Sequence, residues 1–247
     1  MNGLAAAFFL LLTAAARADD AAYAAYARGD YAAAIDLAVA AGGPGDLALA
    51  ARAMNAVSYF DGERKSARRV ADDAYAMATK AIVLDPSLPE AHLQAAIGLG
   101  LKGARMSPVK AFFTGLAGKA REEIDAALAL DPSNPWALST SAAWRIEVAR
   151  RGGGAVYDAD PLLGHAEFMK ARAAAPDNVT VAYECALRLL ADGRAEWRAD
   201  GLSSLDAAIA AAPTTKFEAD VQGLARDFKA AIVGGHDAER AFIGAQP

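Results

Sequence analysis

The residues best suited to catalysis or metal binding are few and widely separated. The chain has three histidines and one cysteine: His92, His165, His236 and Cys185. A structural zinc site needs clustered ligands, and a catalytic thiol needs an activating base beside it. The sequence has neither an HExxH motif nor paired cysteines, and nothing close to Cys185 along the chain could activate its thiol. We therefore predict no catalytic residues, no metal site and no cofactor, and we interpret Cys185 as a small buried apolar residue.

A run of three glycines, residues 152–154, superficially resembles a phosphate-binding loop. Such a loop needs the pattern G-x-x-x-x-G-K-[ST] directly after a strand. Here Ala155 follows the glycines, and the segment before them is predicted to be helical. The run therefore favours a flexible link between two helices.

Two segments are candidates for contacts with a partner. The only dense basic cluster consists of Arg64, Lys65, Arg68 and Arg69. It suits an acidic partner or anionic lipid head groups, or else it is a solvent-facing start of a helix. Phe112 and Phe113 lie in a segment interrupted by a proline. That segment either exposes a docking element or folds back over the neighbouring helices.

Composition limits the class of protein. The 247 residues are 55% hydrophobic and 22% charged, with a formal net charge of −5. These values argue against disorder and against nucleic-acid binding by bulk charge. A single cysteine excludes an intrachain disulfide scaffold. Because alanine is abundant, and alanine favours helices over strands, the predicted class is all-α.

The first 18 residues resemble a secretory signal peptide. An apolar run from Leu4 to Ala16 is too short to span a membrane and ends in the cleavage pattern Ala16-Arg17-Ala18. We expect cleavage near Ala18, which would place the folded domain, residues 19–247, in the periplasm or outside the cell. The alternative is an uncleaved signal that anchors the chain to the inner membrane. The rest of the sequence contains no segment of transmembrane length.

A repeat organises the sequence after residue 19. The segment 84–91, LDPSLPEA, recurs at 130–137 as LDPSNPWA, and looser copies surround Pro176 and Pro213. Each proline follows an alanine-rich stretch and precedes a residue able to cap the next helix. Helix, turn and helix at a recurring interval of roughly 40 residues are typical of an α-solenoid.

Small residues recur at fixed places within each unit. Five residues before each turn proline lie Ala81, Ala127, Ala171 and Ala208. Ten residues after each turn position lie Ala56, Ala96, Ala142, Ala186 and Gly223. Small side chains at these places would let paired helices approach closely.

This pattern resembles the tetratricopeptide repeat (TPR) family over residues 19–232, although the intervals exceed the family's usual length of about 34 residues. The resemblance implies a right-handed α-solenoid of about five degenerate units with a C-terminal capping helix pair. The third unit, with an insert between its helices at 102–119, is similar in topology to the TPR-like domain of the regulator-of-microtubule-dynamics family. We take no function from that likeness.

The expected helix pairs follow from the repeat and its turns. They span residues 20–28 and 31–41, 46–60 and 64–84, 88–101 and 116–130, 134–151 and 160–174, 178–191 and 196–211, and 215–232 and 236–243. The last pair would cover the apolar face left at the end of the stack.

The first helices of TPR units line a concave groove. Residues assigned to that face are Val57, Leu93, Ile97, Trp136, Ser139, Tyr183 and Leu187. The lysines, arginines and asparagines of the known carboxylate clamp are missing, so we expect a protein or peptide with hydrophobic anchors. The predicted function is non-enzymatic partner binding by an exported protein. The alternatives are a self-associating envelope protein, a groove filled by the chain's own C-terminal helix, and, more remotely, an enzyme whose site forms only in three dimensions.

Overall fold

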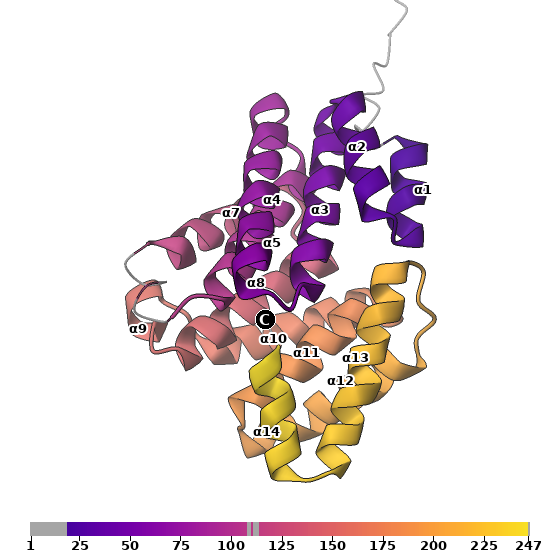
Figure 1. Cartoon of the computed structure of the whole chain (residues 1–247). Coiled ribbons are helices and arrows are strands. Elements are labelled where there is room, and N and C mark those ends of the chain that lie inside the picture. Colours follow the sequence, from indigo (N-terminus) through magenta and orange to yellow (C-terminus); the bar gives the residue numbers. More distant parts are fainter. Residues whose placement is uncertain (1–18, 108–109, 111–113, 247) are drawn as a thin grey trace, which may run out of the picture.

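The computed structural model describes residues 19–107, 110 and 114–246, and within these ranges the chain is helical with no strands. Helices follow one another as antiparallel neighbours (Figure 1). The first half contains α1 (Asp20–Arg28), α2 (Tyr31–Ala41), α3 (Pro44–Phe60), α4 (Arg64–Leu84), α5 (Pro89–Ala104) and α7 (Leu116–Leu130). The second half contains α8 (Pro135–Arg150), α9 (Gly154–Tyr157), α10 (Pro161–Ala174), α11 (Val179–Asp192), α12 (Arg198–Ala210), α13 (Lys216–Val233) and α14 (His236–Ala245).

The predicted helices are confirmed to within three residues at each end. The structure adds the single-turn helix α9 and a short 3₁₀ turn at Ala195–Trp197, which the sequence analysis did not anticipate. The glycine run therefore forms only part of the link between α8 and α10, because its last residue begins α9.

Side-chain hydrogen bonds and prolines stabilise the turns between helices. The Ser87 backbone N–H and hydroxyl both donate to Asp85 Oδ1, at 2.9 and 2.6 Å, and these hydrogen bonds lower the pKa of Asp85. Asn134 caps α8 by accepting from two backbone N–H groups, and Pro135 occupies its first position. Proline suits that position because its missing N–H would have no helical partner.

The recurring small residues lie at the contacts between helices. The four alanines that precede each turn proline by five residues are fully buried. Gly98 marks one close approach, since a Cβ placed there would lie 3.1 Å from the Ala71 carbonyl oxygen of α4. Only small residues allow neighbouring helices to pack this closely.

Helix α13 returns to the helices that begin the described part of the chain. Helix α13 contacts α1, and Figure 1 shows it directly beneath the N-terminal helices. The Phe217 ring at the start of α13 lies 5.7 Å from that of Tyr59 and 5.5 Å from that of Phe60, both at the end of α3. The last helix, α14, contacts α11 and α13. The first helices of successive pairs therefore surround an interior space.

The described parts of the insert fold back onto the helices. Met106 and Leu116 are buried against Leu99 and Trp144 in one core cluster. Phe112, Phe113 and the predicted signal peptide lie outside the described residues. Among the helices that are described, all are too short or too polar to cross a bilayer.

Candidate functional site: an interior cavity

The main cavity lies between α5, α7, α8 and α11 and has a volume of about 540 Å³. This size is typical of sites for small molecules. Apolar and small side chains make up most of its wall, with Tyr59 of α3 and Phe217 of α13 at one side. We call it the interior cavity.

The interior cavity extends along nearly the whole of α8. Its wall includes Trp136, Thr140, Trp144, Glu147 and Arg151, which recur every three or four residues along one helical face. From Trp136 to Arg151 the helix rises about 22 Å. The site is therefore elongated, with aromatic rings along one half and charged groups at the far end.

Helix α11 contributes a polar wall. Thr180, Glu184 and Arg188 recur at intervals of four residues and all line the cavity. The Tyr59 hydroxyl donates to Glu184 Oε1 at 3.0 Å, and Arg188 pairs with Glu184 at 3.2 Å. Burial and the nearby Glu184 carboxylate hold the pKa of Tyr59 well above its usual value. Tyr59 is therefore a hydrogen-bond donor at any physiological pH.

One polar atom in this wall has no partner. Thr180 is only 7% exposed, and its hydroxyl oxygen makes no hydrogen bond. Burying a hydroxyl without a partner costs roughly 1–3 kcal/mol. Most buried polar groups are satisfied, so Thr180 is an exception on this helix, and its hydroxyl oxygen is enclosed by the protein and does not face the open space of the cavity.

Arginines surround Glu147 at the other end of the cavity. The carboxylate pairs with Arg151, and with Arg150 at 2.8 Å. Burial alone would raise the pKa of Glu147, but the positive charges of Arg188, Arg151 and Arg150 lower it overall. The charged side chains that line the cavity are Glu147, Arg151, Glu184 and Arg188, so its wall carries equal positive and negative formal charge, while Arg150 is exposed and lies outside the lining.

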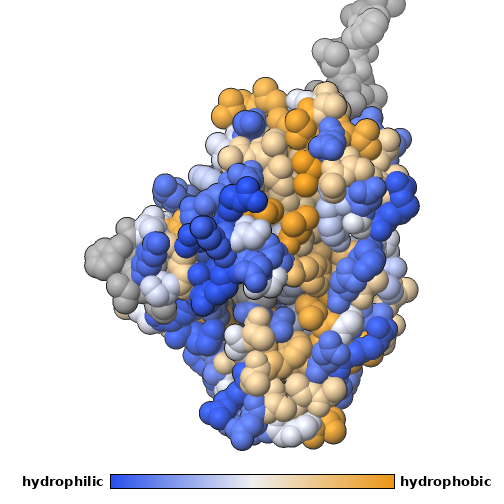
Figure 2. Space-filling model, in the orientation of Figure 1, coloured by the Kyte–Doolittle hydropathy of each residue, from blue (hydrophilic) through white to orange (hydrophobic). Residues whose placement is uncertain are grey.

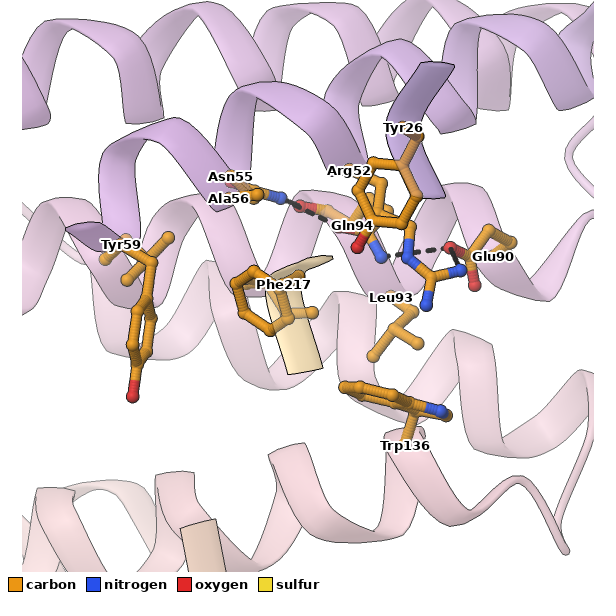
Figure 3. A pocket seen from close by; sticks show the side chains of 12 residues that line it. Tyr26, Arg52, Asn55, Ala56, Tyr59, Glu90, Leu93, Gln94, Trp136 and Phe217 are labelled. Atoms are coloured by element: carbon orange, nitrogen blue, oxygen red, sulfur yellow. Dashed lines mark hydrogen bonds and ion pairs between the residues drawn. The ribbon is translucent and has the colours of Figure 1, made fainter. Parts of the chain in front are cut away.

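A second, smaller pocket of about 70 Å³ adjoins the interior cavity. Both are lined by Tyr59, Ile97, Leu101, Trp136 and Phe217. Figure 3 shows the Arg52 side chain between two aromatic rings, with its guanidinium carbon 5.1 Å from the Tyr26 centroid and 5.5 Å from that of Trp136. Such cation–π contacts fix the arginine and cover the ring faces.

A chain of polar contacts holds the walls of the smaller pocket (Figure 3). Asn55 Nδ2 donates to Gln94 Oε1 at 2.9 Å, and Gln94 Nε2 donates to Glu90 Oε1 at 3.0 Å. Glu90 in turn lies 3.7 Å from Arg52. Burial alone would lower the pKa of Arg52, but Glu90 and Tyr26 raise it. These side chains hydrogen-bond and pair with one another, except that the Asn55 Oδ1 atom is buried without a partner.

The predicted groove residues do not lie together in the structure. Leu93, Ile97, Trp136 and Ser139 line the two cavities, whereas Val57 lines neither. Tyr183 and Leu187 are fully buried in the core that α11 forms with α12 and α13. The interpretation of these two as groove residues is corrected, because the face of α11 towards the cavity is that of Thr180, Glu184 and Arg188.

The basic cluster of α4 does not line the cavity. Arg64, Lys65 and Arg69 are exposed near the start of α4, and Arg68 is partly exposed. Arg64 Nη2 donates to the Arg105 carbonyl at 3.1 Å. Phe112 and Phe113 cannot be placed, since they lie outside the described residues.

The two histidines with described contacts pair with different carboxylates, and Cys185 lies near the second pair, since Trp197 stacks on His165 and packs in one cluster with Cys185. His92 Nδ1 lies 2.7 Å from Glu123, and His165 Nε2 lies 2.8 Å from Asp200. Cys185 Sγ accepts a hydrogen bond from Ser204 at 3.3 Å, and burial raises the pKa of its thiol to about 11. No group of three or more His, Cys, Asp or Glu side chains suited to a metal occurs in the described part of the chain.

Sequence reasoning missed the polar wall of the cavity. The residues concerned are Glu147, Arg151, Thr180, Glu184 and Arg188. A usable signal was present, since Thr180, Glu184 and Arg188 form a polar stripe on a helix that is otherwise apolar. The glycine run also belongs here, because Gly152 and Gly153 line the cavity beyond Arg151.

Comparisons with known proteins give no family for this chain. No protein-family model matches it, and no curated protein is significantly similar to it. A functional conclusion therefore rests on the cavity.

Proposed function

We propose that this chain is a non-enzymatic binding protein built as a TPR-like α-solenoid, and that its ligand occupies the interior cavity. The observation that carries the proposal is an elongated cavity of about 540 Å³ surrounded mainly by the first helices of successive pairs. In a TPR-like arrangement these helices form the concave side, where such proteins bind their partners. The ligand is an apolar or amphipathic molecule that fits between the helices.

The solenoid assignment is supported by the order of helix contacts and by the buried small residues. Successive helices contact one another from α1 to α5, and α8 contacts both α10 and α11. The equivalent alanines Ala56, Ala96, Ala142 and Ala186 are buried, whereas a Cβ added at Gly223 would meet no atom within 4 Å, so the last unit lacks this close approach. Contact between α13 and α1 narrows the concave side, which favours a small molecule over a folded protein partner.

Export by signal cleavage after Ala18 remains part of the proposal. Helix α1 begins at Asp20, and Asp19 caps it by accepting from two backbone N–H groups. Cleavage at Ala18 would therefore leave the first helix intact. The Asp19 backbone N lies 2.6 Å from Asp46 Oδ1, so a new terminal ammonium would gain an ion pair. N-terminal sequencing of the exported protein tests this, and a start other than Asp19 would contradict it.

A substitution that fills the cavity with a side chain tests whether a ligand binds there. Gly100 of α5 lines the cavity, and a Cβ added there meets no atom within 4 Å. We expect Gly100→Phe to abolish binding of the apolar dye ANS, measured by fluorescence, without unfolding the protein. The matched control is Gly244→Phe, which also adds a ring at a helical glycine with open space but outside the cavity. Equal dye binding by both variants and the parent would refute the proposed site.

Self-association is a second candidate, favoured by exposed apolar surface. Val83 and Leu84 end α4 with 77% and 58% of their surface exposed, and Leu130 ends α7 at 40%. Figure 2 shows an apolar band flanked by hydrophilic surface on the face that carries α3, α4, α13 and α14. Light scattering over a range of concentrations tests this candidate, and a constant monomer mass would reject it.

A further inference from the structure

We infer that the interior cavity takes an uncharged, predominantly hydrocarbon molecule and discriminates against charged amphiphiles of either sign. This inference rests on the proposed function and names the chemical class of the ligand. Two features of the cavity carry it: the charges of its wall compensate one another, and the rest of the wall is mainly apolar.

The charged side chains of the wall form a row in which the sign alternates, and we call it the charge row. Its members, in order, are Arg151, Glu147, Arg188 and Glu184. Arg151 pairs with Glu147, and Arg188 pairs with Glu184 at 3.2 Å. Burial alone would lower the pKa of Arg188, but Glu184 and Glu147 raise it overall, so this arginine interacts with both carboxylates. The Tyr59 hydroxyl adds a hydrogen bond to Glu184 at 3.0 Å. Each charge therefore already has an opposite charge beside it.

A charged head group would have to break into the charge row. An anion would compete with Glu147 or Glu184 for an arginine, and a cation would compete with the arginines for a carboxylate. The side chains of Glu147 and Arg188 are only 18% and 16% exposed. Removing the partner of a buried charge is strongly unfavourable, because the remaining charge is neither paired nor fully hydrated. An uncharged ligand leaves the row intact.

Several other polar groups of the wall are used within the protein. The Trp144 indole N–H donates to the Ala117 carbonyl at 2.9 Å, and the Thr140 hydroxyl donates to the Trp136 carbonyl at 2.8 Å. The Thr180 hydroxyl oxygen is enclosed and does not reach the open space. The wall therefore offers few hydrogen bonds to a polar ligand.

The apolar part of the wall supplies the attraction. Leu99, Leu116 and Ile124 line the cavity together with the rings of Trp136 and Trp144. Burial of hydrocarbon against such side chains is favourable in proportion to the area removed from water. A cavity of about 540 Å³ can enclose most of the surface of a small-molecule ligand. We therefore expect affinity to follow the hydrocarbon surface of the ligand and to fall when a charge is added.

Two fluorescent probes give a matched test of this expectation. N-phenyl-1-naphthylamine is uncharged, and ANS has the same ring system with a sulfonate added. We expect the uncharged probe to bind at least tenfold more tightly than ANS in fluorescence titrations. Gly100→Phe should abolish the binding of both probes, because both occupy the interior cavity. Equal or tighter binding of ANS by the parent protein would overturn the inference.

Removing one charge from the row tests whether the row causes the discrimination. Glu147→Gln keeps the shape of the side chain but leaves the wall with two arginines and one glutamate. We expect the affinity for ANS to rise about tenfold, because an arginine without its partner can bind the sulfonate, while the affinity for the uncharged probe stays the same. Glu184→Gln is a second variant with the same expected result.

The control for these variants is Glu122→Gln, since Glu122 is exposed on α7 and does not line the cavity. It should change neither affinity. If the ratio of the two affinities is the same in Glu147→Gln, Glu184→Gln and the parent, the charge row does not select the ligand and the inference is overturned. Circular dichroism confirms that each variant is folded.

Chains with different head groups extend the test to both signs of charge. Dodecanol should displace the uncharged probe at a concentration at least tenfold lower than dodecanoate or dodecylammonium does. Glu147→Gln should strengthen competition by dodecanoate but not by dodecylammonium, a result that hydrophobicity alone would not produce. Displacement by either charged chain at the concentration that suffices for dodecanol would overturn the inference.

The probes also separate the failure of this inference from the failure of the proposed function. If ANS binds as tightly as the uncharged probe and Gly100→Phe abolishes both, the inference fails and the proposed function stands. If Gly100→Phe binds both probes as the parent does, the proposed function fails as well.

Discussion

Two faces of helix α11 can be compared: one packs in a hydrophobic core, and the other forms part of the wall of the cavity. On one face, Tyr183 and Leu187 are fully buried among Leu205 of α12 and Phe228 of α13. On the other, Thr180, Glu184 and Arg188 border the interior cavity. The first face packs directly against α12 and α13, whereas the cavity face borders a space lined by large side chains such as Trp136 and Trp144 and by small ones such as Ala117. How closely the opposing helices approach, together with side-chain size, therefore decides which face is filled.

Small residues have opposite effects in the two regions. Where only two helices meet, an alanine lets them pack directly, as Ala186 and Ala208 do in the C-terminal core. Where four helices surround a common centre, alanines and glycines leave that centre empty. Ala96, Gly100, Ala117, Ala120 and Ala143 all line the cavity. Small residues thus both stabilise the helix pairs and leave room for the cavity.

The largest loss of stability should come from creating a void in the packed core formed by α11, α12 and α13. Phe228 is fully buried and stacks on Phe242 with ring centroids 4.7 Å apart. We expect Phe228→Ala to lower the free energy of unfolding by about 3–5 kcal/mol, measured by urea denaturation, because it leaves an unfilled void. A loss below about 1 kcal/mol would show that this region is not the rigid one and would remove the contrast with the cavity.

Breaking the charged pair in the cavity wall should have the next largest effect. Arg188→Leu leaves Glu184 and Glu147 with fewer counter-charges in a buried setting. We expect a loss of about 3 kcal/mol by urea denaturation. The double variant Arg188→Leu, Glu184→Leu should lose less than the single one, because it removes a charge together with its partner. A double variant that is markedly less stable than the single one would contradict this interpretation.

The free energy of unfolding at alkaline pH should report on a third, packed face of α11, where Cys185 lies. Burial raises the pKa of this thiol from its usual value of 9.0 to about 11. Above pH 9 the unfolded chain releases the proton while the folded chain keeps it, so stability falls as the pH rises. The contribution is fully present below pH 9, and about 2–3 kcal/mol is lost by pH 11. Urea denaturation at several pH values should show a shallower decline for Cys185→Ala, and identical slopes would mean that the thiol is accessible.

The smallest predicted effect is a gain in the free energy of unfolding, not a loss. Thr180→Val replaces an unpartnered buried hydroxyl with a methyl group of nearly the same shape. We expect the ligand-free protein to gain up to about 1 kcal/mol in free energy of unfolding. The control is Thr140→Val, whose hydroxyl donates to the Trp136 carbonyl at 2.8 Å within the same cavity wall. Destabilisation by Thr180→Val would show that the hydroxyl already has a hydrogen-bond partner.

Sequence reasoning succeeded where the determinants are local. The Asp-Pro turns at 85–86 and 131–132 ended helices at the predicted residues, because a capping side chain and a proline act within one turn. The buried alanines before each turn follow from a period of 3.6 residues. The assignment of Tyr183 and Leu187 failed, since both faces of α11 carry apolar residues and periodicity alone cannot say which neighbour each face meets.

The sequence by itself determined the helices, their ends and the small positions at which they pair. Tertiary structure alone decided that α13 returns to α1 and α3, that Phe217 meets Tyr59 across more than half of the chain, and that the centre stays open. It also brought Glu147 of α8 close enough to Arg188 of α11 for their charges to interact. The reason is physical: helix formation depends on neighbours within a few residues, whereas a cavity depends on the summed volumes of side chains from helices far apart in sequence.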